Sequence, residues 1–134
     1  MLALQRNLAS MEHAKFAFAL NTGMSATISV MSLLKQGDHL LCIDDVYGGT
    51  QRYIRKVFEP QTNIDWDMID FSDIKTVEKA MKPNTKICWI ESPTNPTFKC
   101  TDIAAVAKVC KKNGTLLVID NTFMSPALQV SYFR

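Results

Sequence analysis

Short apolar runs recur along the chain, and polar segments and amphipathic stretches separate them. Runs of about five apolar residues between turn residues are typical of β-strands. The last run, Thr115–Ile119, is apolar throughout, as expected for a strand that is covered on both faces of its sheet. The predicted strands are 15–20, 39–43, 64–68, 86–90 and 115–119.

The segments around these runs carry the start and stop signals of helices. Gly37 and Gly114 stand where helices commonly end, and Ser72 or Asp73 can cap the start of a helix. Pro60 is expected to stop the helix that precedes it. The predicted helices are 4–11, 24–36, 50–58, 72–81 and 101–112.

Strands that alternate with helices predict crossover connections and a mostly parallel sheet flanked by helices, which is the α/β class. No repeat or linker-like stretch divides residues 1–134, so one domain is expected. Ligands of such sheets bind beyond the carboxyl ends of the strands. The candidate site therefore consists of the polar segments that follow four of the strands, 21–24, 44–50, 91–97 and 120–125.

Composition and charge narrow the classes of partner. Hydrophobic residues make up 47% and charged residues 21%, which is ordinary for a globular protein. The formal net charge of +2 is too small to indicate nucleic acid or an anionic membrane as a partner. No apolar run approaches the ~20 residues of a membrane-spanning helix, and the first residues do not form a secretory signal.

The cysteines and acidic pairs do not indicate a metal site. The four cysteines lie far apart without a C-x-x-C pair, so we expect them to pack in the core of a protein in the reducing cytoplasm. Asp44 and Asp45 are adjacent, but no histidine accompanies them. No metal is therefore expected.

Gly23 and Met24 follow the first predicted strand and begin a predicted helix. The first N–H groups of a helix are unpaired, and its dipole adds partial positive charge, so a phosphate suits this position. A glycine there lets the phosphate approach the backbone. A plain strand-to-helix turn would carry the same residues, and no glycine motif of a nucleotide site is present.

Two further segments offer an aromatic ring and an amide. Tyr47 precedes Gly48 and Gly49, so its ring could lie flat against a planar ligand, although a flexible turn explains it equally. Asn95 lies between two prolines that stiffen the chain. A rigid loop of this kind can aim the amide at a ligand oxygen, and a structural Asn-Pro turn is the alternative.

Asp120 directly follows the most apolar run. A carboxylate buried there without a partner costs several kcal/mol, so we expect it to face a cation or a strong donor, with a helix cap as the alternative. Thr122 would project on the same side if the strand continues. A phosphate cradle, an aromatic ring, an amide and a carboxylate at one sheet edge match the needs of pyridoxal phosphate.

Several stretches resemble the pyridoxal-phosphate enzymes of cysteine and methionine metabolism, the transsulfuration family, and most of all those of the cystathionine γ-lyase kind. They keep the order and spacing of that family across nearly the whole chain, and the segment DNTFMSP is close to the corresponding sequence of eukaryotic cystathionine γ-lyases. The stretches are 22–26, 37–38, 44–50, 89–97 and 118–126.

The resemblance implies part of the large domain of the fold-type I, aspartate aminotransferase-like fold, in an enzyme that forms homotetramers. It also implies an amino-acid substrate, with L-cystathionine cleaved to cysteine, 2-oxobutanoate and ammonia. Gly23 and Met24 would offer backbone N–H groups to the cofactor phosphate.

The resemblance assigns the ring of pyridoxal 5'-phosphate to four other residues. Tyr47 would stack on the ring and help with proton transfer, which makes it the catalytic candidate. Asn95 would bond the ring hydroxyl oxygen and Asp120 the ring nitrogen, and Thr122 would lie close to the ring.

The chain also departs from the family. Gly49 stands where methionine γ-lyases usually carry a cysteine, whereas cystathionine γ-synthase and β-lyase remain open. The upstream arm, the Ser-x-Thr-Lys segment whose lysine binds the cofactor, and the C-terminal domain do not occur in these residues. Lys15 and Lys99 lie in no matching motif.

The chain alone is therefore expected to be a catalytically incompetent fragment that at most associates with full-length subunits. The family's last strand would pair with 15–20, so we also expect an unpaired apolar edge and marginal stability.

Overall fold

Four parallel strands form one sheet in the computed structural model, which describes residues 1–130. The strand order is β2-β1-β3-β4, and all three pairings are parallel. The strands are β1 His39–Ile43, β2 Asp65–Ile69, β3 Thr85–Glu91 and β4 Leu116–Asp120. The predicted α/β class with a mostly parallel sheet is confirmed.

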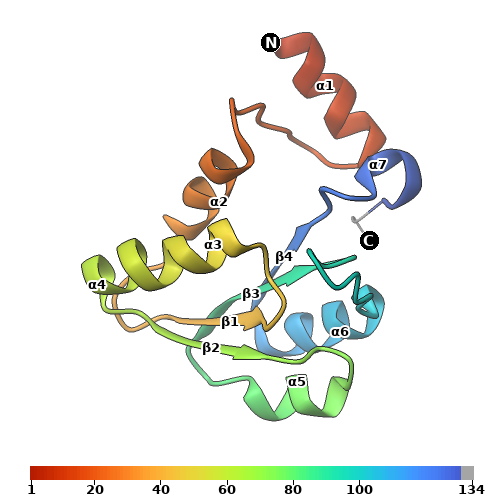
Figure 1. The fold of residues 1–134 in the computed structure, drawn as a ribbon. Coiled ribbons are helices and arrows are strands. Elements are labelled where there is room, and N and C mark those ends of the chain that lie inside the picture. Colours follow the sequence, from red (N-terminus) through yellow and green to blue (C-terminus); the bar gives the residue numbers. More distant parts are fainter. Residues whose placement is uncertain (131–134) are drawn as a thin grey trace.

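Helices cover the sheet on two sides (Figure 1). The helices α2, α3 and α4 lie on one side, α5 and α6 lie on the other, and α1 packs beside α7 away from the strands. The helices are α1 Leu2–Met11, α2 Gly23–Met31, α3 Gly48–Tyr53, the π-helical segment η1 Ile54–Phe58, α4 Glu59–Thr62, α5 Ile74–Ala80, α6 Ile103–Asn113 and α7 Ser125–Leu128. No helix in this part of the chain is long and apolar enough to cross a membrane.

The core lies around the two central strands. All five residues of β1 are buried, and β3 buries every residue except Lys86. Val77 of α5 and Val106 of α6 close one face, and Ile54 closes the other. Each such side chain stabilises the fold by roughly 1.5–3 kcal/mol when it leaves water. Burial on both faces explains why these strands are continuous apolar runs in the sequence.

Two of the strand predictions were wrong in part. Residues 15–20 form no strand, and Phe16 and Phe18 are 69% and 81% exposed, because no described strand pairs with them. The expected unpaired strand edge is thus not there, although exposed apolar side chains are. β4 was expected to be covered on both faces, but Leu116 is 48% exposed. β4 also lies at the edge of the described sheet, with β3 as its partner.

The helix at Pro60 does not stop where predicted. It continues through η1 and α4 to Thr62, and Asn63 ends it in the left-handed conformation with φ 51°. The wider π-helical turn precedes Pro60, which lies in the first turn of α4, where its missing N–H is tolerated. The helix predicted over 24–36 is also shorter than expected, since α2 ends at Met31.

Other helix signals are confirmed. The Asp73 carboxylate accepts a hydrogen bond from the Lys75 backbone N–H at 3.0 Å and caps α5. Asp102 caps α6 in the same way, and Gly114 ends that helix with φ 65°. Of the four free cysteines, three are buried as predicted, and Cys100 is exposed.

A polar cluster ties three strands together at the amino-terminal edge of the sheet. His39 is fully buried; its Nδ1 lies 2.7 Å from Thr85 Oγ1 and its Nε2 lies 3.2 Å from Asp67 Oδ2. Lys82 Nζ lies 2.8 Å from the same Asp67 oxygen and 2.7 Å from Asp65. Burial, with the Lys82 charge second, lowers the pKa of His39 from its ordinary value. The imidazole is therefore held in its neutral form.

We expect acid to weaken the fold through His39. Because the pKa of His39 is lowered in the folded chain, the unfolded chain binds the proton more tightly, and the free energy of unfolding falls as the pH drops below 6.5. Denaturant unfolding curves at about pH 7.5 and about pH 5.5 measure this difference in the free energy of unfolding. His39→Asn should remove most of it, whereas His13→Asn, at an exposed position, should keep it. Equal pH dependence in the wild type and His39→Asn would contradict the assignment.

Candidate functional site

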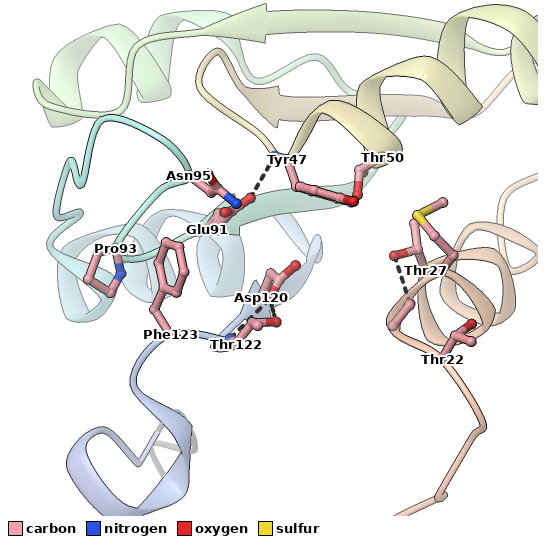
Figure 2. Close-up of a pocket in the computed structure, with 12 residues that line it drawn as sticks. Thr22, Thr27, Tyr47, Thr50, Glu91, Pro93, Asn95, Asp120, Thr122 and Phe123 are labelled. Atoms are coloured by element: carbon pink, nitrogen blue, oxygen red, sulfur yellow. Dashed lines mark hydrogen bonds between the residues drawn. The ribbon is translucent and has the colours of Figure 1, made fainter.

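A cavity of about 320 Å³ opens at the carboxyl ends of β1, β3 and β4, beside the start of α2. Figure 2 shows side chains from these elements facing it. All six candidate residues line the cavity, so the structure brings together every residue that sequence reasoning selected. The lining residues are Thr22, Gly23, Met24, Thr27, Tyr47, Thr50, Glu91, Pro93, Asn95, Asp120, Thr122 and Phe123.

The first wall of the cavity is the amino end of α2. Thr22 caps this helix, because its Oγ1 accepts a hydrogen bond from the Ser25 N–H at 3.0 Å and its carbonyl accepts one from Ala26. The N–H groups of Gly23 and Met24 have no acceptor in the described part of the chain. A Cβ added to Gly23 would meet nothing within 4 Å, so the space beside these amides is open. Such a site fits an anionic oxygen.

The second wall is the ring of Tyr47, which lies directly over Gly49. A Cβ on Gly49 would stand 2.5 Å from Tyr47 Cε1 and 3.2 Å from Met24 Sδ. The ring can therefore occupy its place only because Gly49 has no side chain. Gly48, one residue earlier, has no atom within 4 Å of such a Cβ. The sequence singled out Gly49 only through the family resemblance, and it assigned no packing role to either glycine.

The third wall is the loop that carries Asn95, and it is fastened to the turn after β1. The Thr94 hydroxyl, which is buried, donates to Asp45 Oδ2 at 2.5 Å, and the Thr97 hydroxyl donates to the same oxygen. Lys99 Nζ forms an ion pair with Asp44 at 3.2 Å. The two hydroxyls hold the pKa of Asp45 below its ordinary value. Asn95 is thus held on a loop with several fixed points.

The fourth wall is Asp120, the last residue of β4. It is only half-buried, and its Oδ1 accepts hydrogen bonds from the Thr122 N–H at 3.1 Å and from the Thr122 hydroxyl at 2.5 Å. The expected cation is not found among the described residues, so Thr122 is the strong donor that the sequence required. The helix-cap alternative does not apply, because α7 starts at Ser125 after Met124. Oδ2 of Asp120 has no partner in residues 1–130 and remains available to a donor.

Several lining residues have no role assigned from the sequence, and Glu91, which lies in the candidate segment 91–97, matters most among them. Glu91 is 5% exposed, and its Oε2 accepts a hydrogen bond from the Tyr47 backbone N–H at 2.8 Å. Burial raises the pKa of Glu91, and the nearby charge of Asp120, its neighbour in the β3–β4 register, adds to the shift. The signal was present in the sequence, since Glu91 ends an apolar run as Asp120 does.

Phe123 lies in the candidate segment 120–125, but the sequence assigned it no role. Its ring stacks on that of Phe98, with centroids 5.3 Å apart and planes at 15°. No pattern in the sequence indicates this contact, because the two rings come from different loops. The other lining residues without an assigned role are Thr22, Thr27, Thr50 and Pro93, and only Thr27 lies outside the candidate segments.

The sequence matches the family described as Cys/Met metabolism PLP-dependent enzyme over residues 1–132. This chain belongs to that family. The cofactor of the family is pyridoxal 5'-phosphate, and its phosphate, ring nitrogen and flat ring fit the open amides of α2, the free oxygen of Asp120 and the exposed face of Tyr47. The described residues contain no group of His, Cys, Asp and Glu that could hold a metal ion.

Known relatives agree with the family but differ in their named reaction. The chain is 52% identical to the putative cystathionine gamma-lyase 2 of Caenorhabditis elegans, over 94% of this chain and 33% of that protein. It is 44% identical to a probable cystathionine gamma-synthase of Herpetosiphon aurantiacus, over 92% of this chain and 39% of that protein.

Among solved structures, cystathionine gamma-lyase from Lactobacillus plantarum complexed with L-serine superposes with a TM-score of 0.93 at 40% identity, over 96% of this chain and 34% of that chain. The fold is therefore that of the cystathionine lyases and synthases, consistent with the fold-type I large domain. The chain spans between 33% and 39% of the length of these proteins.

We expect Gly49→Ala to displace the Tyr47 ring, because the new methyl group would occupy the space of Cε1. Contacts between the Tyr47 ring and the Met24 side chain, measured as nuclear Overhauser effects, should weaken or disappear. Gly48→Ala is the matched control, since the same change one residue earlier meets no atom. Similar spectra for Gly49→Ala and the wild type would contradict this packing.

Proposed function

We propose that this chain forms the cofactor-binding part of a pyridoxal-phosphate enzyme that cleaves L-cystathionine to cysteine, 2-oxobutanoate and ammonia in the whole protein. The observation that carries the proposal is the convergence of unpaired backbone N–H groups, an exposed aromatic ring, an amide and a free carboxylate oxygen on one cavity of about 320 Å³. Family membership supports transsulfuration chemistry in general.

The phosphate would bind at the start of α2. Gly23 and Met24 present N–H groups without acceptors, and the helix dipole adds partial positive charge there. The hydroxyl of Thr27 is turned to the Gly23 carbonyl at 3.1 Å and does not compete for the site. This end of the cavity thus suits the anionic part of the cofactor.

The ring would lie between Tyr47 and Asp120. Pyridoxal phosphate, when bound, supplies an electron sink for the negative charge that develops on the amino-acid substrate. Asp120 would hold a proton on the ring nitrogen through its free Oδ2, and Thr122 would fix the carboxylate through Oδ1. Asn95 would bond the ring hydroxyl oxygen, and Tyr47 would stack on the ring and move a proton at Oη.

We further propose that the 134 residues alone bind the cofactor without turning over substrate, because they contain no Ser-x-Thr-Lys segment. Of the relatives, one is named a gamma-lyase and another a gamma-synthase, so a synthase or a β-lyase reaction is the alternative. A cytoplasmic location is part of the proposal and is supported by the four free cysteines.

A second candidate function is association with full-length subunits of the homotetramer expected for the family. The edge position of β4 supports it, because β3 is its single partner among the described strands and Leu116 of β4 is 48% exposed.

Replacing Asp120 should weaken cofactor binding. Asp120→Ala removes a charge-assisted hydrogen bond worth about 1.5–3 kcal/mol, so the affinity for pyridoxal phosphate should fall about 10- to 150-fold in equilibrium dialysis. Asp65→Ala is the control, since this carboxylate lies at the opposite edge of the sheet. In a full-length version, Asp120→Ala should abolish cystathionine cleavage. Activity or affinity within a few-fold of the wild type would exclude the assigned role.

Association can be tested by co-purification. A tagged copy of this chain, expressed together with a full-length subunit, should retain that subunit, because the open edge of β4 offers exposed apolar surface. Leu116→Lys should reduce the yield of the pair, whereas Leu33→Lys, at a position 55% exposed just after α2, should not. Absence of the full-length subunit from the wild-type preparation would leave the chain without this role.

A further inference from the structure

Glu91 is a buried carboxylate that the proposed cofactor roles leave unused. It ends β3, it is 5% exposed, and it lines the cavity. No cationic side chain of the described residues forms an ion pair with it. A buried carboxylate without a cation is costly unless backbone donors compensate it. The donors that Glu91 does have therefore define its role.

Those donors come from the two segments that carry candidate ring contacts. The Tyr47 N–H donates to Glu91 Oε2 at 2.8 Å, and Tyr47 is the residue that starts α3. The backbone N–H of Asn95 also approaches the carboxylate and favours its charged form. In Figure 2 the Glu91 carboxylate lies below the Tyr47 turn and beside Asn95. One side chain thus contacts both loops.

The strand pairing fixes this contact relative to Asp120. Glu91 and Asp120 are partners in the β3–β4 register, so both carboxylates end adjacent strands at the same level. A group bonded to Glu91 is consequently placed relative to Asp120 by the sheet itself. The Asp45 bonds to Thr94 and Thr97 fasten the outer part of the Asn95 loop, whereas Glu91 acts at its inner part.

We propose that Glu91 is a positioning residue, whose carboxylate ties the Tyr47 turn and the Asn95 loop to the end of β3 and so sets the ring and the amide relative to Asp120. The proposal rests on the proposed function for its consequence, which is cofactor affinity. The bond itself belongs to the chain without cofactor and can be tested there.

The first experiment follows backbone amide resonances of the full chain without cofactor through a pH titration. The Tyr47 and Asn95 amides should shift together, with a midpoint above the ordinary glutamate value of 4.5. The titratable groups that face Glu91 are Asp120 on β4, Asp45 after β1 and Cys42 on β1. Glu91→Gln should abolish the common shift, and Glu78→Gln, exposed on α5, should keep it. Persistence of the shift in Glu91→Gln would overturn the proposal.

The second experiment measures pyridoxal-phosphate affinity in a graded series. Glu91→Gln keeps the length and one acceptor oxygen, whereas Glu91→Leu keeps neither the acceptor nor the charge. We expect affinity to fall by at least about tenfold in Glu91→Leu, by less in Glu91→Gln, and not at all in Glu78→Gln. Equal affinities of the Gln and Leu variants would show that the acceptor oxygen makes no difference and overturn the proposal, as would wild-type affinity in both.

The two experiments separate this proposal from the proposed function. If the wild type does not bind pyridoxal phosphate, the proposed function fails, while the amide titration still decides whether Glu91 holds the two loops. If the wild type binds and Glu91→Leu binds as well, the proposed function stands and the positioning role does not. A melting curve for each variant confirms that the compared chains are folded.

Discussion

The parallel pairing of β3 with both β1 and β4 is the constraint on which the candidate site depends. It brings the ends of three strands to one edge, where the residues that follow β1 meet Glu91 and Asp120. The pairing is stabilised by burial, because β3 places every residue except Lys86 between the helices on the two faces of the sheet. The core therefore specifies the geometry of the cavity as well as the stability of the fold.

The two ends of the cavity favour opposite charges, which suits a ligand with an anionic group at one end and a protonated nitrogen at the other. Backbone N–H groups at the start of α2 line one end of the cavity, and they favour an anion. Across the cavity stand the carboxyl groups of Glu91 and Asp120, which favour a protonated nitrogen or another donor. A ligand placed in the reverse orientation would bring its anion against two carboxylates.

Sequence patterns predicted the features that depend on local rules and missed those that depend on partners. β1 and β3 were predicted because each is a continuous apolar run, and Asp73 was predicted as a cap, with Ser72 as the alternative, because capping is local. Residues 15–20 have the same appearance, but a strand requires a neighbour, which the local pattern cannot supply.

The candidate site shows the same division. The six selected residues were found because each follows a predicted strand, and the carboxyl ends of parallel strands share an edge. The Thr122 donor to Asp120 is local and lay within reach of the sequence. The contact of Glu91 with the Tyr47 backbone could not be predicted, since it depends on how separate segments meet in space. The helix end predicted at Pro60 was wrong for another reason, because no simple sequence signal indicates the π-helical turn that precedes this proline.

The His39 cluster lies at the other end of β1 from the cavity, and a strand of five residues spans roughly 16 Å. The residues that shift the pKa of His39 are also different from those that shift the pKa of Glu91. Charge changes at the two edges should therefore act independently. Evolution or protein engineering could adjust the tolerance of this fold to acid through His39 and its partners without altering the electrostatic field in which a ligand would bind.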